Sequence, residues 1–220
     1  MVKIEELFSR IPNILEPLFR GALYPWEILP AIKGYIEALL ENPPKGYTLY
    51  SDGVLVGEGV KIADSAEIIP PAVIGAGTEI RQGAYLRGCV ITGERCVIGN
   101  STEVKNSVLF DRVQIPHYNY VGDSILGNLS HMGAGSVCSN LKNDGTTVTV
   151  RGEKKYETGL RKLGAILADG VNVGCGCVLN PGTVIGKGTD VYPLLSLRGV
   201  LPEDSIVKTP SDIVRKSERE

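Results

Sequence analysis

The chain has 220 residues, a formal net charge of −2, and 27 glycines against three phenylalanines and one tryptophan. This balance predicts one domain with a core of small aliphatic side chains, and it gives no electrostatic case for nucleic-acid binding. No apolar run approaches the ~20 residues of a membrane span, and the N-terminus lacks the regions of a secretory signal. The five cysteines have no paired CxxC spacing, so we expect free thiols in a reducing cytoplasm.

Residues 1–46 follow helical spacing, for example at Ile28, Ile32 and Ile36. Several prolines divide this segment, and Pro43–Pro44 ends it. We expect two or three short helices that cap one end of the following domain, because the terminal coil of a repeat protein exposes apolar groups and unpaired backbone. The alternative is that these helices dock against another subunit or a partner.

From Val54 the chain follows a count of six. An apolar residue recurs at every sixth position from 56 to 110, and Thr92 interrupts the series. The recurring residues are Val56, Ile62, Ile68, Ile74, Ile80, Leu86, Ile98, Val104 and Phe110. A small or β-branched residue stands two positions before each, so both side chains point to one side of an extended strand. Hexapeptide repeats predict a mainly β fold, a single-stranded parallel β-helix of about six coils over 47–202.

The repeat is interrupted twice. After Phe110 the register slips across 114–119, and the inward series resumes at Tyr120 and continues through Leu126. Residues 140–164 then leave the pattern, are rich in Lys and Arg, and predict an inserted loop or hairpin with Thr147–Val150 as one strand. The count resumes at Leu167. We expect residues 203–220 to form a frayed, charged tail.

The glycine pairs are interpreted as turn residues. The run Gly174-Cys175-Gly176 lacks a third glycine at the spacing of a dinucleotide loop, and Gly186-Lys187-Gly188 lacks the residues of a Walker loop. The chain has two histidines, His117 and His131, which is one too few for a three-histidine metal site within one chain. No metal is expected.

His117 lies where the repeat breaks, and function often concentrates where a regular scaffold is interrupted. His131 precedes Met132 and projects outward from a coil. Imidazole suits general-base work near neutral pH. The opposing interpretations are a loop histidine bonded to backbone for His117 and a solvated or interfacial side chain for His131.

Four runs carry a family resemblance. They are Gly99-Asn100-Ser101-Thr102-Glu103-Val104-Lys105, then Pro116-His117-Tyr118-Asn119-Tyr120-Val121-Gly122-Asp123-Ser124, then Gly133-Ala134-Gly135-Ser136-Val137-Cys138-Ser139-Asn140, and then Thr158-Gly159-Leu160-Arg161-Lys162-Leu163-Gly164-Ala165. Together they resemble the acetyltransferase half of bifunctional glucosamine-1-phosphate acetyltransferase/N-acetylglucosamine-1-phosphate uridyltransferases, most closely the archaeal-type sugar-1-phosphate nucleotidyltransferases with a C-terminal β-helix. The resemblance covers residues 50–202 and implies a left-handed β-helix, a cytoplasmic homotrimer, and acetyl-CoA as co-substrate.

The resemblance also implies roles for individual residues. His117 matches the general base that takes a proton from the sugar amine. Arg87 and Lys105 match positions that hold the sugar phosphate, and their spacing of 18 residues places them on one edge of adjacent coils. A further set of residues matches the binding surfaces. Tyr120 and Asn140 match the amino-sugar pocket, His131 stands where bacterial members carry Asn in that pocket, and Ala134 and Cys175 match coil edges along which coenzyme A runs.

The chain departs from the pattern near Thr146, where the family often has Lys. It also contains no nucleotide loop of the uridyltransferase half. The leading hypothesis is therefore an acetyl-CoA-dependent N-acetyltransferase acting on glucosamine or galactosamine 1-phosphate, without uridyl transfer. The alternatives are a non-catalytic trimeric scaffold or sugar-nucleotide-binding module, and an acyltransferase with another amino or hydroxyl acceptor.

Overall fold

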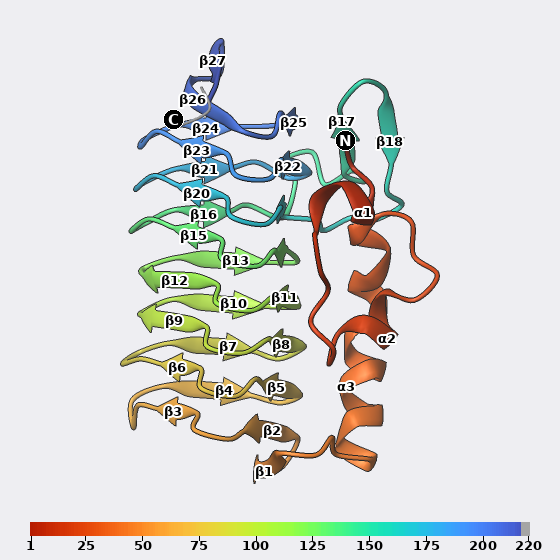
Figure 1. Cartoon of the computed structure of the whole chain (residues 1–220), viewed down its shortest axis with the longest axis vertical. Helices are drawn as coiled ribbons and strands as arrows, with labels where there is room; N and C mark the ends of the chain where they lie inside the picture. The colour runs from red at the N-terminus through yellow and green to blue at the C-terminus, as the bar shows by residue number, and fades with distance from the viewer. Residues whose placement is uncertain (217–220) are drawn as a thin grey trace.

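Three parallel sheets form the sides of a prism in the computed structural model, which describes residues 1–216 (Figure 1). We call the sides face A, face B and face C. Face A contains β1 (Tyr47–Ser51), β2 (Val54–Gly57), β5 (Ala72–Ile74), β8 (Val90–Thr92), β11 (Ser107–Leu109), β14 (Ile125–Leu126), β19 (Ala165–Leu167), β22 (Thr183–Ile185) and β25 (Val200–Leu201). Face B contains β3 (Lys61–Ile62), β6 (Glu79–Ile80), β9 (Val97–Asn100), β12 (Gln114–His117), β15 (His131–Met132), β20 (Asn172–Val173), β23 (Asp190–Val191), β26 (Ser205–Thr209) and β27 (Asp212–Arg215). Face C contains β4 (Glu67–Ile69), β7 (Tyr85–Arg87), β10 (Glu103–Lys105), β13 (Tyr120–Gly122), β16 (Val137–Cys138), β21 (Val178–Leu179) and β24 (Ser196–Leu197).

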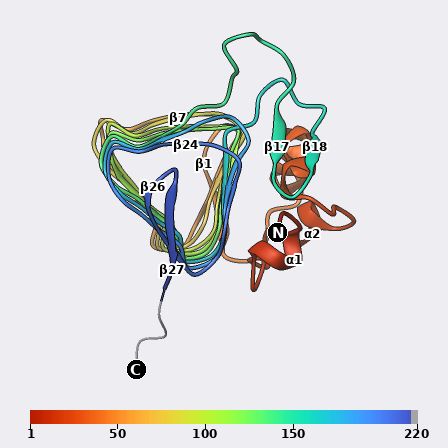
Figure 2. The same ribbon diagram turned by 90° about the horizontal axis from the view of Figure 1, so that it is seen from above.

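Each coil passes through face A, then face B, then face C. Seen from the C-terminal end, with the chain advancing toward the viewer, this path runs clockwise (Figure 2). The prism is therefore a left-handed parallel β-helix, as predicted. Within residues 1–216, face C has seven strands, which makes the β-helix one coil longer than the sequence count indicated.

Stacked aliphatic side chains fill the prism. On face C the inward column contains Ile68, Leu86, Val104, Val121, Cys138, Leu179 and Leu197, in hydrogen-bonded register from coil to coil. Thr92 occupies an inward position on face A, where it is fully buried and its hydroxyl accepts a hydrogen bond from the Gly75 backbone N–H at 2.9 Å. The interruption at Thr92 is thus accommodated because its polar atom has a partner.

The change in the six-residue register does not occur across 114–119, as predicted, but at two corners of the prism. Val104 is followed on the inside by Leu109, and Val121 by Leu126, so two steps contain five residues instead of six. The shortened corners are formed by Asn106 and Asp123, whose φ angles are +45° and +48°, a left-handed conformation that Asn and Asp tolerate better than most residues.

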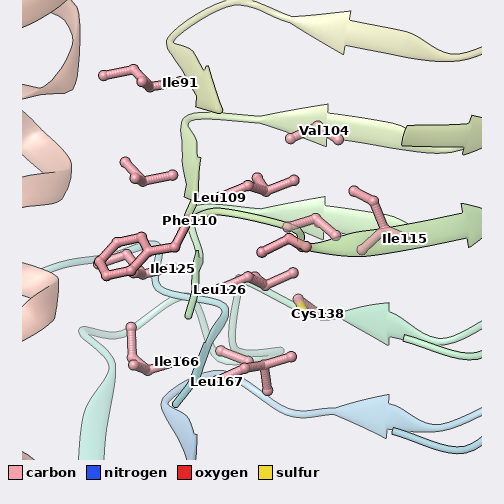
Figure 3. Close-up of a cluster of buried hydrophobic side chains, with 14 of the residues drawn as sticks. Ile91, Val104, Leu109, Phe110, Ile115, Ile125, Leu126, Cys138, Ile166 and Leu167 are labelled. Carbon is pink, nitrogen blue, oxygen red and sulfur yellow. The ribbon is translucent and has the colours of Figure 1, made fainter. Parts of the chain in front are cut away.

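Two inward assignments were therefore wrong. Val121, not Tyr120, is buried inside the prism, and Phe110 points outward toward the helical segment (Figure 3). The stretch Gln114–His117 is also a regular strand, β12, with Ile115 buried.

A helical layer covers the outer side of face A (Figure 1). It consists of α1 (Ile4–Leu7), α2 (Glu16–Phe19), a 3₁₀ helix (Pro25–Ala31) and α3 (Ile32–Glu41). α3 stops before Pro43–Pro44, since a residue that precedes proline disfavours the helical conformation.

The cap predicted for one end of the prism is thus a side cover. The physical reason is that face A is apolar on both sides: its outward residues Leu55, Val73, Ile91, Val108, Ile125, Ile166 and Val184 are also buried. Figure 3 shows Ile91, Phe110, Ile125 and Ile166 directed toward the helices, while Leu109, Leu126 and Leu167 point into the prism. The Phe110 ring lies 4.6 Å from Phe8 and 5.5 Å from Phe19, centroid to centroid.

The insertion at 140–164 forms an antiparallel hairpin of β17 (Thr149–Arg151) and β18 (Lys155–Glu157), which confirms the predicted hairpin. It leaves the prism at the corner between faces C and A and lies beside the helical layer (Figure 2). There Tyr156 packs edge-on against Tyr24 and Trp26, with ring centroids 5.5 and 6.2 Å apart.

Antiparallel strands terminate the prism. β1 pairs antiparallel with β2 at the N-terminal end, and β27 pairs antiparallel with β26 at the C-terminal end. The region predicted as a frayed tail is ordered strand through Arg215, and the rest of that prediction, at 217–220, lies outside the described residues.

Candidate functional site

The corner between faces B and C stacks three of the predicted site residues in one column. His117 ends β12, and Ala134 and Cys175 occupy the same corner position in the next two coils. Backbone hydrogen bonds connect them: Gly135 N–H donates to the His117 carbonyl at 3.1 Å, and Gly176 N–H donates to the Ala134 carbonyl at 2.8 Å. With about 4.8 Å between coils, Cys175 lies roughly 10 Å from His117 along the prism.

The His117 corner is held in place by hydrogen bonds of the Asn119 side chain. Tyr118 makes the turn with a φ of +51°. Asn119 is buried, and its side-chain amide donates to the carbonyls of Gly133 and Ser136 at 2.8 and 3.2 Å while its oxygen accepts the His117 N–H at 3.1 Å. The backbone on both sides of the imidazole is thus fixed, and the His117 side chain is exposed.

Arg87 and Lys105 lie at the opposite edge of face C. The strand register pairs Glu103 with Tyr85 and Val104 with Leu86, so Arg87 and Lys105 are neighbours at the ends of β7 and β10. This placement agrees with their predicted position on one edge of adjacent coils. Arg87 donates to Glu103 at 2.6 Å, and this contact raises the pKa of the guanidinium.

Asp123 is a buried carboxylate that joins two of the predicted binding residues. It accepts hydrogen bonds from Lys105 Nζ at 3.4 Å, Asn106 Nδ2 at 2.8 Å and Asn140 Nδ2 at 2.5 Å. Its side chain is 6% exposed, whereas that of Lys105 is 27% exposed. A buried charge needs such partners, and Asp123 in turn fixes Lys105 and Asn140.

Sequence reasoning assigned no role to Asp123 or Glu103. The run Val121-Gly122-Asp123-Ser124 was among the residues that carry the resemblance, so the signal for Asp123 was present. An acidic residue at a coil corner, however, is ordinarily a solvated turn residue. Its burial follows from the insertion, because the Asp123 and Asn140 carbonyls accept hydrogen bonds from Gly164 N–H and Leu163 N–H.

Tyr120 lies between these two edges. It begins β13, three residues after His117, and its outward side chain is half-buried. Burial raises the pKa of the phenol, with smaller contributions from Glu103 and Asp123. Tyr120, Asn140, Lys105 and Arg87 therefore share the outer side of face C, and His117 borders it at the B–C corner.

His131 is not brought to this group within one chain. It opens β15 on face B and is in register with Gln114, three residues before His117. At about 3.3 Å per residue, this places it roughly 10 Å along the strand from the His117 position. Its Nδ1 lies 2.8 Å from Asn172 Oδ1. The insertion leaves the prism at the C–A corner, so it does not flank His117 in the same chain (Figure 2).

The observed fold, a left-handed β-helix of hexapeptide coils, is the one that the resemblance implied. The amino-acid sequence is also similar to those of known proteins. No protein-family model matches the chain. It is 29% identical over 199 residues to a bifunctional protein GlmU of Methanococcus maripaludis, an alignment that covers 89% of this chain and 48% of that protein. It is 34% identical over 182 residues to a bifunctional sugar-1-phosphate nucleotidylyltransferase/acetyltransferase of Sulfurisphaera tokodaii, covering 77% of this chain and 43% of the relative. These relatives confirm the predicted resemblance, and the chain spans about half their length.

Among solved structures, a hexapeptide transferase family protein from Anaplasma phagocytophilum aligns with 76% of this chain and 82% of its own, at 20% identity and a TM-score of 0.49. Within the described residues, no helix is both long and apolar enough to cross a membrane. All five cysteines are free thiols, as predicted.

Proposed function

We propose that the chain is an acyltransferase of the hexapeptide type that transfers the acetyl group of acetyl-CoA to the amine of an amino-sugar 1-phosphate, glucosamine or galactosamine 1-phosphate. One observation carries the proposal: His117, Ala134 and Cys175 stack along one corner of the prism, beside a face that presents Arg87 and Lys105. The name of the Sulfurisphaera tokodaii relative supports this chemistry, since it contains both sugar-1-phosphate and acetyltransferase.

In this proposal, His117 removes a proton from the sugar ammonium or from the attacking amine. The amine nitrogen attacks the thioester carbon, the C–S bond breaks, and the coenzyme A sulfur leaves as a thiolate that takes up a proton. An exposed imidazole on a rigid corner suits this role because its lone pair reaches solvent and substrate without a backbone movement. Ala134 and Cys175 would line the pantetheine arm along the corner.

The sugar phosphate would bind between Arg87 and Lys105. Both cations already have carboxylate partners, Glu103 and Asp123. These contacts hold the side chains at the outer edge of face C, and a phosphate would add to them as a third charged group. Tyr120 and Asn140 would contact the sugar between this edge and His117.

A homotrimer would complete such a site, because the corner is convex and one prism leaves a bound coenzyme exposed. The helical layer occupies face A, so faces B and C remain for contact with neighbouring copies. Sedimentation of the full chain should give three copies per particle, and a stable active monomer would contradict the shared site.

The test is a thiol-release assay with acetyl-CoA and each amino-sugar phosphate. His117→Ala should lower the rate by about 10²- to 10⁴-fold, the range of a general base. Gln114→Ala is the matched control, since Gln114 is exposed on the same strand. Full activity in His117→Ala would remove the base from the proposal. His131→Asn addresses the acceptor, and a gain toward glucosamine 1-phosphate would favour a different natural acceptor.

A non-catalytic sugar-nucleotide-binding module is the second candidate. The observation that favours it is the ion pairing of Arg87 and Lys105, which holds both cations without any ligand. Tight binding of UDP-N-acetylglucosamine, together with no thiol release from acetyl-CoA in the presence of any amino sugar, would decide for this module.

A further inference from the structure

A polar cavity of about 310 Å³ lies at the C–A corner, where the insertion meets the upper coils. Its lining includes three cations, Lys142, Arg151 and Arg198, and one carboxylate, Asp144. These residues come from three separate parts of the chain: the start of the insertion, the hairpin strand β17, and the corner after β24. The cavity is thus formed by tertiary structure.

Two glycines seat the hairpin on this corner. A Cβ on Gly182 would lie 2.9 Å from the Thr149 carbonyl oxygen, and a Cβ on Gly199 would lie 2.9 Å from that of Arg151. Both glycines also have φ of +80°, which a residue with a side chain rarely adopts. The close approach brings Arg151 beside the coil that carries Arg198.

The charges in the cavity are unbalanced. Lys142 pairs with Asp144 at 3.4 Å and donates to Thr146 at 2.5 Å. Hydrogen bonds from Thr146 hold the pKa of the Asp144 carboxyl below its usual value. Among residues 1–216, neither Arg151 nor Arg198 takes part in an ion pair. The lining therefore has a surplus of two guanidinium groups.

We propose that this cavity binds the diphosphate group of a nucleotide. Two guanidinium groups facing one space repel each other, and an anion between them removes the repulsion. Guanidinium forks match phosphate oxygens in a bidentate geometry. The volume lies at the lower end of small-molecule pockets, which suits a diphosphate with part of its attached ribose or sugar. Sugar nucleotides and coenzyme A both contain this group.

The diphosphate site is separate from the proposed acetyl-transfer residue. The cavity is at the C–A corner, and His117 is at the B–C corner, with the strands of face C between them. The proposal therefore does not rest on acetyl transfer, and ligand binding can be measured in His117→Ala as well as in the natural chain.

Calorimetric titration of the full chain with pyrophosphate at low salt tests the site. Each of Arg151→Gln and Arg198→Gln should weaken binding by about tenfold, the loss expected for one charge-assisted hydrogen-bonding group. The double variant should weaken it further. Arg20→Gln is the control, because Arg20 is an exposed arginine in the helical segment. Asp144→Asn should strengthen binding, a gain that a folding defect cannot produce.

Competition with pyrophosphate shows which kind of nucleotide supplies the diphosphate group. If UDP-N-acetylglucosamine is displaced by pyrophosphate and coenzyme A is not, the occupant is a sugar nucleotide, and the reverse result assigns the cavity to the coenzyme. Equal pyrophosphate affinity in the double variant and the natural chain would overturn the proposal, as would no binding to the natural chain at low salt.

Discussion

Faces A and C are built on the same repeat, yet their outer surfaces are used in opposite ways. The outward positions of face A hold Val73, Ile91 and Ile125, all buried beneath helices. Those of face C hold Glu103 and Tyr120, which remain partly accessible. Because the inward residues are alike on both faces, the outward residue of each hexad decides whether a face is used for packing or for polar contacts. The inward residues thus build the β-helix, and the outward residues determine what each face contacts.

The largest expected effect comes from weakening the packing on face A. Ile125→Ala should lower the free energy of unfolding by about 2–5 kcal/mol, because it leaves a cavity beneath the helical layer. Val178→Ala, an outward substitution on face C at a residue that is 37% exposed, should change the free energy of unfolding by no more than about 0.5 kcal/mol. Denaturant unfolding measures both, and equal losses would remove the distinction between the two faces.

A smaller effect is expected from the buried carboxylate at the C–A corner. Asp123→Asn places an amide donor against Lys105 and Asn140, and should cost about 1–3 kcal/mol of stability. It should also lower kcat/KM, since both partners are proposed binding residues. Asp64→Asn, at an exposed coil corner, is the control. Loss of stability with unchanged kinetics would give Asp123 a purely structural role.

Binding on face C should be separable from its folding. Lys105→Met should raise KM for the sugar phosphate by about tenfold, the loss of one charge-assisted contact, while KM for acetyl-CoA stays the same. Lys61→Met on face B, which is exposed, should leave both constants unchanged. A parallel rise in the two KM values would place Lys105 outside the phosphate site.

The smallest effect concerns the cysteines of the prism. Burial raises the pKa of the Cys96 and Cys138 thiols to about 12 from 9.0. The folded state thus keeps these protons longer than the unfolded state, so their contribution to stability is complete below pH 9 and is lost as pH rises toward 12. The Cys96→Ala/Cys138→Ala chain should show a shallower fall of Tm between pH 8.5 and 10. An identical pH slope in both proteins would contradict this assignment.

The sequence predicted the β-helix because its signal repeats many times. Ile62, Ile80 and Ile98 lie 18 residues apart and stack in one column. The register change was misplaced because Asn106 and Asp123 each turn a corner with one left-handed residue, and nothing in composition separates these from ordinary corner residues. The prediction of an end cap was wrong, although the sequence contains a signal for the side placement: Val54-Leu55-Val56 and Ala72-Val73-Ile74 are apolar at the outward position too.

In the candidate site, too, the features that follow from the repeat were predictable and those that depend on tertiary structure were not. Spacing by 18 residues correctly placed Arg87 beside Lys105, because a strand register follows from the repeat. The stacking of Cys175 above Ala134 spans the insertion, so counting along the chain does not reveal it. The contacts of Asp123 depend on how the ends of the insertion close on the corner, which is a tertiary effect.

The antiparallel strands at the two ends of the prism oppose end-to-end stacking of one copy on the next. A solenoid whose last strands all ran parallel would offer the next copy the same ladder that each coil offers its neighbour, and fibres would grow by axial stacking. β1 and β27 each reverse the chain direction in one sheet, so an incoming coil meets a mismatched hydrogen-bonding pattern. In-register axial stacking is thereby disfavoured at face A of the N-terminal end and at face B of the C-terminal end.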